Sequence, residues 1–257
     1  MNIFISTLLI SFFIQILFFT FAATFKTDKL TDLAYGLTFI FISWWLLLTK
    51  SNLLSTQLIL TISITLWGLR LATYLFIRIL KIGKDNRFDS IRENFFSFFK
   101  FWTFQAVTIW VVMLPSIYAL PSHKTISINY WTILGSIIFL TGLVIETSAD
   151  WQKFKFKNNL ANNSKWIETG LWKYSRYPNY FGEMMVWWGI FITTINWQSN
   201  LSWLTILGPM FITFILLFIS GIPLLEKRYN KKYKNDLKYQ SYKKCTSLLI
   251  PWFPRKS

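Results

Sequence analysis

Residues 170–183 combine cations, an amide, a carboxylate and a proline at spacings that suit an anionic ligand. Pro178 predicts the first turn of a helix, because its missing N–H would have no partner at that position anyway. Arg176 then lies just before this helix, and Asn179 and Glu183 lie one turn apart at its start. A helix N-terminus beside a cation favours an anion such as phosphate. The alternative is an interfacial anchor, in which these side chains lie at headgroup level and Glu183 is simply hydrated.

A second set of ionisable residues falls on one predicted helical face. Glu146, Asp150, Lys153 and Lys157 recur at spacings of four, three and four residues, which places them in one stripe on a helix. The carboxylates could accept hydrogen bonds from amide or ribose groups while the lysines bind phosphate. The alternative is salt bridging between neighbours, worth roughly a few tenths of a kcal/mol per pair.

A third stripe lies inside an apolar segment and contains Arg70, Tyr74, Arg78 and Lys81. Charged side chains in a bilayer are costly unless they face the bundle interior or water. Arg78 and Lys81 lie near the end of the segment and could extend their charges to the interface. Arg70 lies deeper in the segment, so an interfacial position does not account for it.

The loop between residues 81 and 93 is dense in charges of both signs. One interpretation is a solvated connection between two helices. The other is that it supplies Lys84, Arg87 and Arg92 to an anionic ligand.

Several classes of site are disfavoured by what the sequence lacks. One histidine, His123, and one cysteine, Cys245, argue against a metal site and an intrachain disulfide framework. The chain has no G-x-G-x-x-G motif and no P-loop, so any nucleotide site must be assembled from membrane helices and loops. There is no pattern of a nucleic-acid-binding module.

The composition is that of a polytopic membrane protein. Hydrophobic residues make up 53% of the chain and aromatic residues 20%, and the apolar residues come in blocks of membrane length. We therefore expect an all-α bundle of about seven transmembrane helices, forming a single membrane domain over residues 1–257. The predicted spans are residues 3–23, 33–49, 53–80, 95–114, 128–145, 179–195 and 201–220.

The distribution of basic residues predicts the orientation. Seven spans place the N-terminus and three short loops on one side, and that side carries only Lys50 and Lys124. Nearly all other basic residues fall on the opposite side, which is therefore predicted to be cytoplasmic. The N-terminus would lie on the outer side and the C-terminus on the cytoplasmic side of a bacterial inner membrane. The net charge of +16 thus has a membrane explanation and does not require a nucleic-acid partner.

Residues 224–257 form a strongly basic tail. Leu225, Tyr229, Tyr233 and Leu237 recur every four residues, which predicts one amphipathic helix lying on the membrane surface. Residues 250–254, with the sequence IPWFP, are predicted to form a re-entrant or interfacial cap.

Four segments resemble the steroid 5-alpha-reductase-like membrane proteins, specifically their bacterial DUF1295 branch. They are GLWKYSRYPNYFGEMMVWWG from Gly170, ETSADWQKFKFK from Glu146, GKDNRFDSIRE from Gly83, and GIPLLEKRY followed by YQSYKKCTSLLIPWFP from Gly221. The resemblance covers most of the chain from about residue 70 onward. The commonest form of the first motif has His where this chain has Tyr177.

The resemblance implies a helix bundle with a cofactor cavity open to the cytoplasm and reduction of a C=C bond with NADPH. A lipid-like substrate would enter from the membrane, and Tyr74 or Arg70 would act on its carbonyl, with Tyr35 and Tyr118 as open alternatives. The oligomeric state is left open. The positions that would bind NADPH are Lys84, Glu146, Asp150, Lys157, Lys165, Tyr174, Arg176, Asn179, Glu183, Trp187 and Arg228.

Two other classes stay open on the sequence. Isoprenylcysteine carboxyl methyltransferases share a similar Arg-His-Pro-x-Tyr signature and use S-adenosylmethionine. They need no site for a 2′-phosphate, so a large cationic cluster favours NADPH. A scaffold or transporter is the third class, but the paired broken helices of inverted repeats are missing from the sequence pattern.

Overall fold

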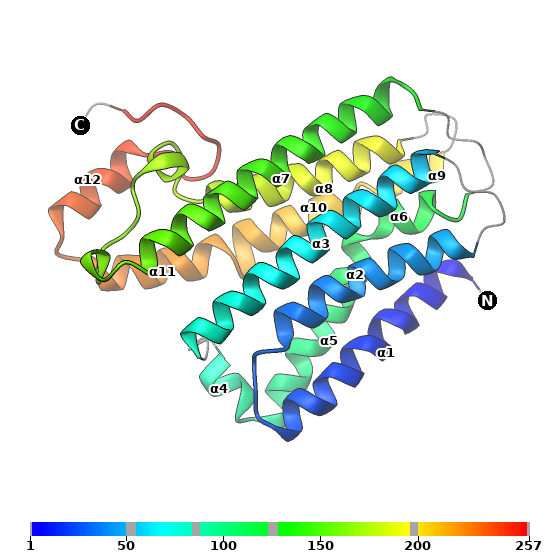
Figure 1. The fold of residues 1–257 in the computed structure, drawn as a ribbon, viewed down its shortest axis with the longest axis horizontal. Helices are drawn as coiled ribbons and strands as arrows, with labels where there is room; N and C mark the ends of the chain where they lie inside the picture. The colour runs from blue at the N-terminus through cyan, green and yellow to red at the C-terminus, as the bar shows by residue number, and fades with distance from the viewer. Residues whose placement is uncertain (1, 50–54, 84–87, 123–127, 196–199, 256–257) are drawn as a thin grey trace. The chain divides into compact units, whose positions relative to one another are not determined.

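The fold is all-α, as the sequence predicts. The computed structural model describes residues 2–49, 55–83, 88–122, 128–195 and 200–255 (Figure 1). Within those ranges there is no β-strand, and the one isolated bridge pairs Ser175 with Ser247. Lys50, Lys84, Arg87, His123 and Lys124, which the sequence analysis names, lie outside the described residues.

The helices vary from four to 28 residues in length. In chain order they are α1 (Ile3–Thr24), α2 (Thr31–Leu48), α3 (Ser55–Ile82), α4 (Asp89–Arg92), α5 (Phe95–Val112), α6 (Leu114–Ala119), α7 (Tyr130–Lys157), α8 (Pro178–Thr194), α9 (Asn200–Leu204), α10 (Leu207–Phe214), α11 (Ile222–Lys232) and α12 (Leu237–Cys245). Short 3₁₀ turns η2 (Leu160–Asn162) and η3 (Gly170–Lys173) and a π-turn η4 (Ile215–Ile219) complete the described elements.

Six segments of the described chain are long and apolar enough to cross a membrane. They are Ile3–Thr24, Thr31–Leu48, Ser55–Lys81, Phe95–Val112, Tyr130–Lys157 and Ser202–Lys232. The remaining predicted span corresponds to α8, which has 17 residues and so lies at the lower limit for a spanning helix. The last segment runs through α9, α10, η4 and α11 and is longer than the span predicted for it.

The chain divides into two compact units. Unit 1 comprises Met1–Gly135 and Ile190–Gly208, and unit 2 comprises Ser136–Gly189 and Pro209–Ser257. In unit 1, α2 packs closely on α3 at Gly36. A Cβ added there would lie only 2.7 Å from the Gly68 carbonyl oxygen, so the backbones approach too closely for a side chain. Small residues permit such close approach of membrane helices. Buried rings of Phe19, Phe98 and Trp102 fill the space between α1 and α5.

In unit 2, α7 and α8 are in backbone contact. A Cβ added at Gly182 would lie 2.6 Å from the Glu146 amide nitrogen and 2.7 Å from the Gly142 carbonyl oxygen. Real side chains do not approach backbone so closely, so position 182 accepts only glycine without a shift of one helix. The contact sets the first turns of α8, which carry Asn179 and Glu183, against the α7 turn that carries Glu146.

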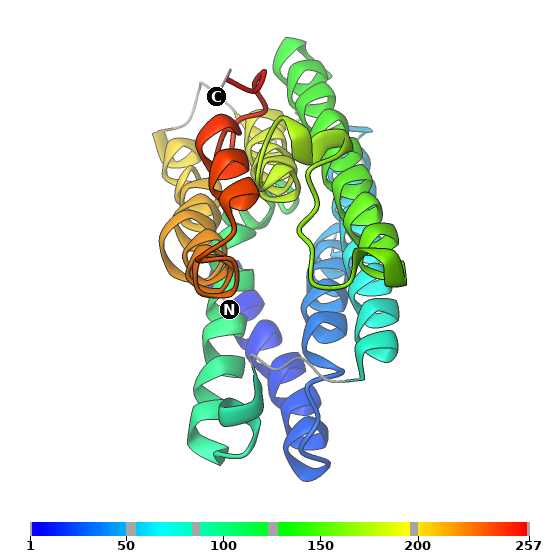
Figure 2. The same cartoon turned by 90° about the vertical axis from the view of Figure 1, so that its left-hand side faces the viewer.

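The basic tail forms two helices, so the prediction of one amphipathic helix is wrong. α11 ends at Lys232, and α12 begins after Asp236, whose carboxylate caps the amides of Lys238 and Tyr239. α12 folds back beside α11 (Figure 2). Tyr233 is 6% exposed whereas Leu237 is 79% exposed, because the break after α11 places them in different surroundings.

The α7–α8 contact can be tested by substitution. Gly182→Ala should lower the free energy of unfolding by about 1–3 kcal/mol, because the added methyl group meets backbone that cannot rotate away. Thermal denaturation of the detergent-purified protein measures the effect. Thr147→Ala, at an exposed position of α7, is the control and should stay within about 0.5 kcal/mol of wild type. Equal stability of the two variants would contradict the close contact.

Candidate functional site

The candidate site is built on the loop that joins α7 to α8. Gly170 begins η3 with a φ of +62°, a conformation that favours glycine. The Leu171 amide donates to Gln152 Oε1 at 2.9 Å, and the Trp172 indole N–H donates to the Ala149 carbonyl at 3.0 Å. Both acceptors belong to α7, so the loop is fixed on that helix. Pro178 is the first residue of α8, which confirms the predicted helix start.

The other side of this loop is fixed by residues 246–255, which we call the C-terminal strap. The Arg176 amide donates to the Ser247 carbonyl at 2.9 Å, and the Ser175 hydroxyl donates to the Leu249 carbonyl at 2.7 Å. In return, the Trp252 amide donates to the Tyr174 carbonyl at 3.0 Å. The loop therefore lies between α7 and the strap, with its backbone hydrogen-bonded to both.

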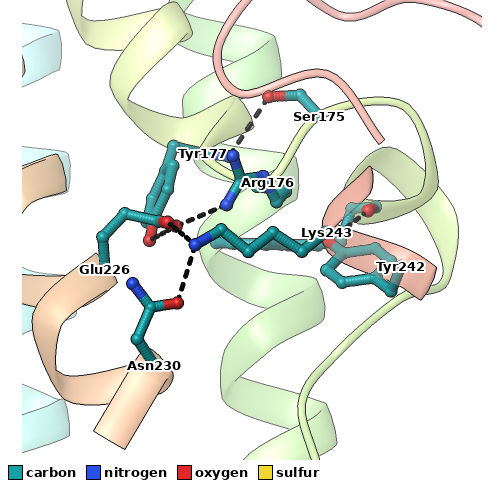
Figure 3. Close-up of polar contacts among 8 residues, drawn as sticks. Ser175, Arg176, Tyr177, Glu226, Asn230, Tyr242 and Lys243 are labelled. Carbon is teal, nitrogen blue, oxygen red and sulfur yellow. Dashed lines mark hydrogen bonds and ion pairs between the residues drawn. The ribbon is translucent and has the colours of Figure 1, made fainter. Parts of the chain in front are cut away.

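A carboxylate from α11 lies at the centre of the site's charged groups (Figure 3). Glu226 Oε1 accepts from Arg176 at 2.6 Å and from the Tyr177 hydroxyl at 2.8 Å. Its other oxygen lies 3.2 Å from the Lys243 ammonium, which also donates to Asn230 at 2.7 Å. The Arg176 and Glu226 side chains are only 12% and 18% exposed, so this ion pair is shielded from much of the solvent.

Aromatic rings surround this charged cluster. Trp166 lies with its ring centroid 5.2 Å from those of Tyr233 and Tyr239. The Lys153 ammonium lies 4.6 Å from the centroid of Trp172, within the range of a cation–π interaction. The rings enclose a cavity of about 20 Å³, which holds about one water molecule. Its lining residues are Trp166, Ile167, Trp172, Arg176, Tyr177, Glu226, Tyr229, Tyr239 and Tyr242.

The tyrosines of the site that lie outside the spanning segments stay protonated. Burial raises the pKa of Tyr177, and its hydrogen bond to Glu226 raises it further. Burial and the Glu226 charge raise the pKa of Tyr239 to about 12. Burial also raises the pKa of Tyr242, whose hydroxyl donates to the Trp172 carbonyl at 2.7 Å. These hydroxyls act as hydrogen-bond donors throughout the neutral range.

Two buried polar atoms of the motif are unsatisfied. Arg176 Nε and Asn179 Oδ1 are inaccessible to solvent and have no hydrogen-bond partner among the described residues. A buried donor or acceptor without a partner costs roughly 1–3 kcal/mol, so such atoms usually have a reason to be kept. One is a donor and the other an acceptor, and both flank Pro178.

The carboxylates predicted for the site are buried in unit 2. Glu146 and Asp150 on α7 are 2% and 8% exposed, and Glu183 on α8 is half-buried. Trp187, one turn further along α8, is 1% exposed. Lys153 belongs to the same stripe as the α7 carboxylates. Its ammonium lies over the ring of Trp172, which lines the cavity.

The remaining predicted ligands of unit 2 lie nearer the surface. The exposed Lys157 ammonium donates to the carbonyl oxygen of Lys165 at 2.6 Å. This hydrogen bond links the end of α7 to the loop between α7 and α8. Arg228 is exposed on α11. Tyr174 is half-buried, with its ring centroid 5.9 Å from that of Phe253 in the strap.

Other predicted residues lie in unit 1 or outside the described chain. Arg70 and Tyr74 on α3 are half-buried, and the guanidinium lies 5.6 Å from the Tyr74 ring centroid. Arg92 pairs with Asp28 at 3.0 Å and also with Asp89. Asp28 is 5% exposed, so Arg92 has a structural partner and its predicted use as an anion ligand is not supported. Lys84 is not among the described residues.

Three residues of the cluster were missed by sequence reasoning as site residues. In the sequence, Tyr177 stands out only as a departure from the usual His, and Glu226 and Lys243 lie within the basic tail, residues 224–257. Glu226 did carry a signal, since it is one of two carboxylates in residues 224–257. A lone carboxylate among many cations is expected to be paired.

Comparison with known proteins identifies the family. Residues 18–246 match the family described as Protein of unknown function (DUF1295). The chain belongs to this family. It is also 23% identical, over 211 residues, to an uncharacterized protein of Schizosaccharomyces pombe, an alignment that covers 68% of this chain and 58% of that protein. The chain thus spans less than two thirds of the length of the curated relative it matches. No solved structure matches significantly.

The family match covers most of the site but ends at the first residue of the strap. It includes the motif loop, Glu226 and Lys243, and it ends at residue 246. The reductases that the sequence resembles commonly have His at the position of Tyr177, and here the Tyr177 hydroxyl donates to Glu226. An imidazole N–H can donate to a carboxylate in the same way, which explains physically how both residue types suit the position.

The bond between Tyr177 and Glu226 gives a stability prediction. Tyr177→Phe should lower the free energy of unfolding by about 1.5–3 kcal/mol, the usual range for a hydrogen bond to a charged group. Tyr177→His should recover part of this loss, because imidazole can donate to the carboxylate. Chemical denaturation in detergent measures both variants. Tyr130→Phe, at a position that is 74% exposed, is the control, and an equal loss there would contradict the assignment.

The raised tyrosine pKa values predict an alkaline loss of stability. The unfolded chain deprotonates its tyrosines near pH 10, whereas the folded chain keeps Tyr239 protonated to about pH 12. The stability that each such protonated tyrosine contributes to the folded state is therefore fully present below about pH 10. It is lost as the pH rises, by about 1.4 kcal/mol per pH unit for each tyrosine. Melting temperatures measured from pH 8 to 11 should fall above pH 10, and less steeply in Tyr242→Phe.

Proposed function

We propose that the protein is a membrane-embedded, NADPH-dependent reductase that adds hydride to a C=C bond of a lipid-like substrate. The observation that carries the proposal is the pair of unsatisfied buried atoms at the start of α8. Arg176 Nε is a donor and Asn179 Oδ1 is an acceptor. A carboxamide such as that of nicotinamide both donates and accepts, so it complements such a pair.

The surrounding charge favours an anionic cofactor. Arg176 and Lys243 pair with one carboxylate, Glu226. A third cation, Lys153, lies over the ring of Trp172, which lines the cavity. Lys157, Lys165 and Arg228 add exposed cations on the same unit. NADPH carries one phosphate more than NADH, and that extra charge suits a surplus of cations. Glu146, Asp150 and Glu183 are the candidate acceptors for ribose hydroxyl groups, and Tyr174 and Trp187 are candidate aromatic contacts.

Binding would require the site in unit 2 to open. The enclosed cavity of about 20 Å³ is far smaller than a nucleotide, whose sites usually measure hundreds of Å³. The ion pairs of Glu226 with Arg176 and Lys243 hold α11 and α12 against the motif loop. Phosphate groups can replace Glu226 as partners of these cations, so a nucleotide can compensate for the contacts that it breaks.

When bound, NADPH would provide hydride chemistry for reduction of a C=C bond conjugated to a carbonyl. The chain must then supply a proton to the substrate and stabilise the negative charge that develops on the carbonyl oxygen. We assign the proton to Tyr74, with Arg70 orienting its ring. Under this assignment Tyr74→Phe should retain NADPH binding and lose turnover.

Ligand titration tests the cofactor. Purified full-length protein in detergent should bind NADPH saturably and NADH more weakly. Arg176→Lys and Glu183→Gln should each raise the Kd for NADPH by roughly ten- to a hundredfold, the loss of one charge-assisted hydrogen bond. Lys155→Ala is the control, because Lys155 is an exposed cation of α7 outside the predicted set, and its Kd should stay within about twofold of wild type.

The same titration separates the other classes. Saturable binding of S-adenosylmethionine, with no binding of NADPH, would identify a methyltransferase, and binding of neither would favour a scaffold. If Lys155→Ala and Arg176→Lys changed the Kd for NADPH equally, the binding would reflect general charge attraction. That result would overturn the assignment of the site.

We further propose that the N-terminus lies outside and the C-terminus in the cytoplasm of a bacterial inner membrane. The asymmetry of basic residues supports this orientation, since Lys50 and Lys124 are the only Lys or Arg on the predicted outer side. Alkaline phosphatase fused to the C-terminus should be inactive, and green fluorescent protein fused there should be fluorescent. An active phosphatase fusion would reverse the orientation.

A further inference from the structure

The C-terminal strap forms a closed loop. The Arg255 amide donates to the Cys245 carbonyl at 2.9 Å, so the end of the strap returns to the end of α12. Pro251 and Pro254 restrict the backbone between them. The hydrogen bonds of the strap to Tyr174, Ser175 and Arg176 fix this loop on unit 2.

The strap exposes large apolar side chains. Trp252 is 70% exposed and Phe253 is 76% exposed, and Ile250 and Leu248 are 61% and 40% exposed. Such a run of exposed apolar residues marks an interaction surface rather than a solvated loop. Trp side chains are enriched at the interface between lipid headgroups and acyl chains.

Cations lie beside these apolar groups. A groove of about 430 Å³ is lined by Lys244, Leu248, Ile250, Trp252, Phe253 and Arg255, among others. Arg255 is one of the two residues joined by the hydrogen bond that closes the strap, and Lys244 directly precedes the other, Cys245. Both cations therefore lie at the same end of the loop. The groove therefore combines positive charge with an apolar wall.

We propose that this groove binds an anionic glycerophospholipid. Lys244 and Arg255 pair with its phosphate, and Trp252, Phe253 and Ile250 contact its glycerol and upper acyl chains. The spanning helices of this chain place it in a bilayer, where such lipids are abundant ligands, and basic residues near the membrane surface attract them. A free phosphate would leave the apolar wall exposed to water, so the groove suits a lipid better.

The lipid proposal does not depend on the proposed nucleotide site, although Phe253 of the groove lies against Tyr174, a candidate cofactor contact. It also has a consequence for the motif loop, because the strap's backbone is hydrogen-bonded to Tyr174 and Arg176. A lipid that orders the strap would steady these residues from the side opposite α7.

Native mass spectrometry of the detergent-purified full-length protein tests the proposal. Dioleoylphosphatidylglycerol should bind in preference to dioleoylphosphatidylcholine. Lys244→Gln/Arg255→Gln should raise its Kd by about thirtyfold, which corresponds to two basic residues at about 1 kcal/mol each. Lys234→Gln/Lys238→Gln is the matched control, because it removes the same charge from exposed residues that do not line the groove, and its Kd should change less than about threefold.

Two further arms separate the lipid from free phosphate and guard against misfolding. Glycerol 3-phosphate should not compete with the lipid, because it lacks the apolar part. Phosphatidylglycerol with brominated acyl chains should quench less of the tryptophan fluorescence in Trp252→Phe than in wild type. The proposal is overturned by equal Kd changes in the two double variants, by equal binding of phosphatidylcholine, by competition from glycerol 3-phosphate, or by undiminished quenching in Trp252→Phe.

Discussion

The Glu226 carboxylate joins three segments that are far apart in the sequence. It receives Arg176 and Tyr177 from the motif loop and Lys243 from α12, while it belongs to α11 itself. In a chain with a net charge of +16, these cations would repel one another without a carboxylate between them. The position of the motif loop in unit 2 therefore depends on this one negative charge, which the surrounding rings partly shield from water.

The same interaction connects the fold with the proposed chemistry. A partly buried ion pair is costly to break unless another ligand replaces the lost partner. Under the proposed function, phosphate groups of the nucleotide would be such ligands for Arg176 and Lys243 and would replace Glu226. The nicotinamide carboxamide would then pair with the atoms of Arg176 and Asn179 that have no partner among the described residues.

Backbone contacts provide the second constraint. α7 and α8 meet where Gly142 and Gly182 leave no room for a side chain, and the C-terminal strap is hydrogen-bonded to the motif loop on its other side. Because lipid tails are as apolar as leucine, the hydrophobic effect does little to choose between helix pairings in a bilayer. Close packing at glycines and hydrogen bonds to backbone decide the arrangement instead.

The sequence by itself determined the helical class, six of the seven predicted membrane segments, the family and the start of α8 at Pro178, because these follow from local composition, periodicity, short motifs and the geometry of proline. It also predicted Glu146, Asp150 and Lys157 as ligands of the same cofactor as Arg176, and this stays a prediction, because the cavity that Arg176 lines is not lined by these three residues. Only the tertiary structure showed that Tyr177, Glu226 and Lys243 form one cluster, that the tail folds as two helices, and that Arg92 is paired with Asp28. The cluster and the Arg92–Asp28 pair depend on contacts between residues far apart in the chain, which no local pattern encodes.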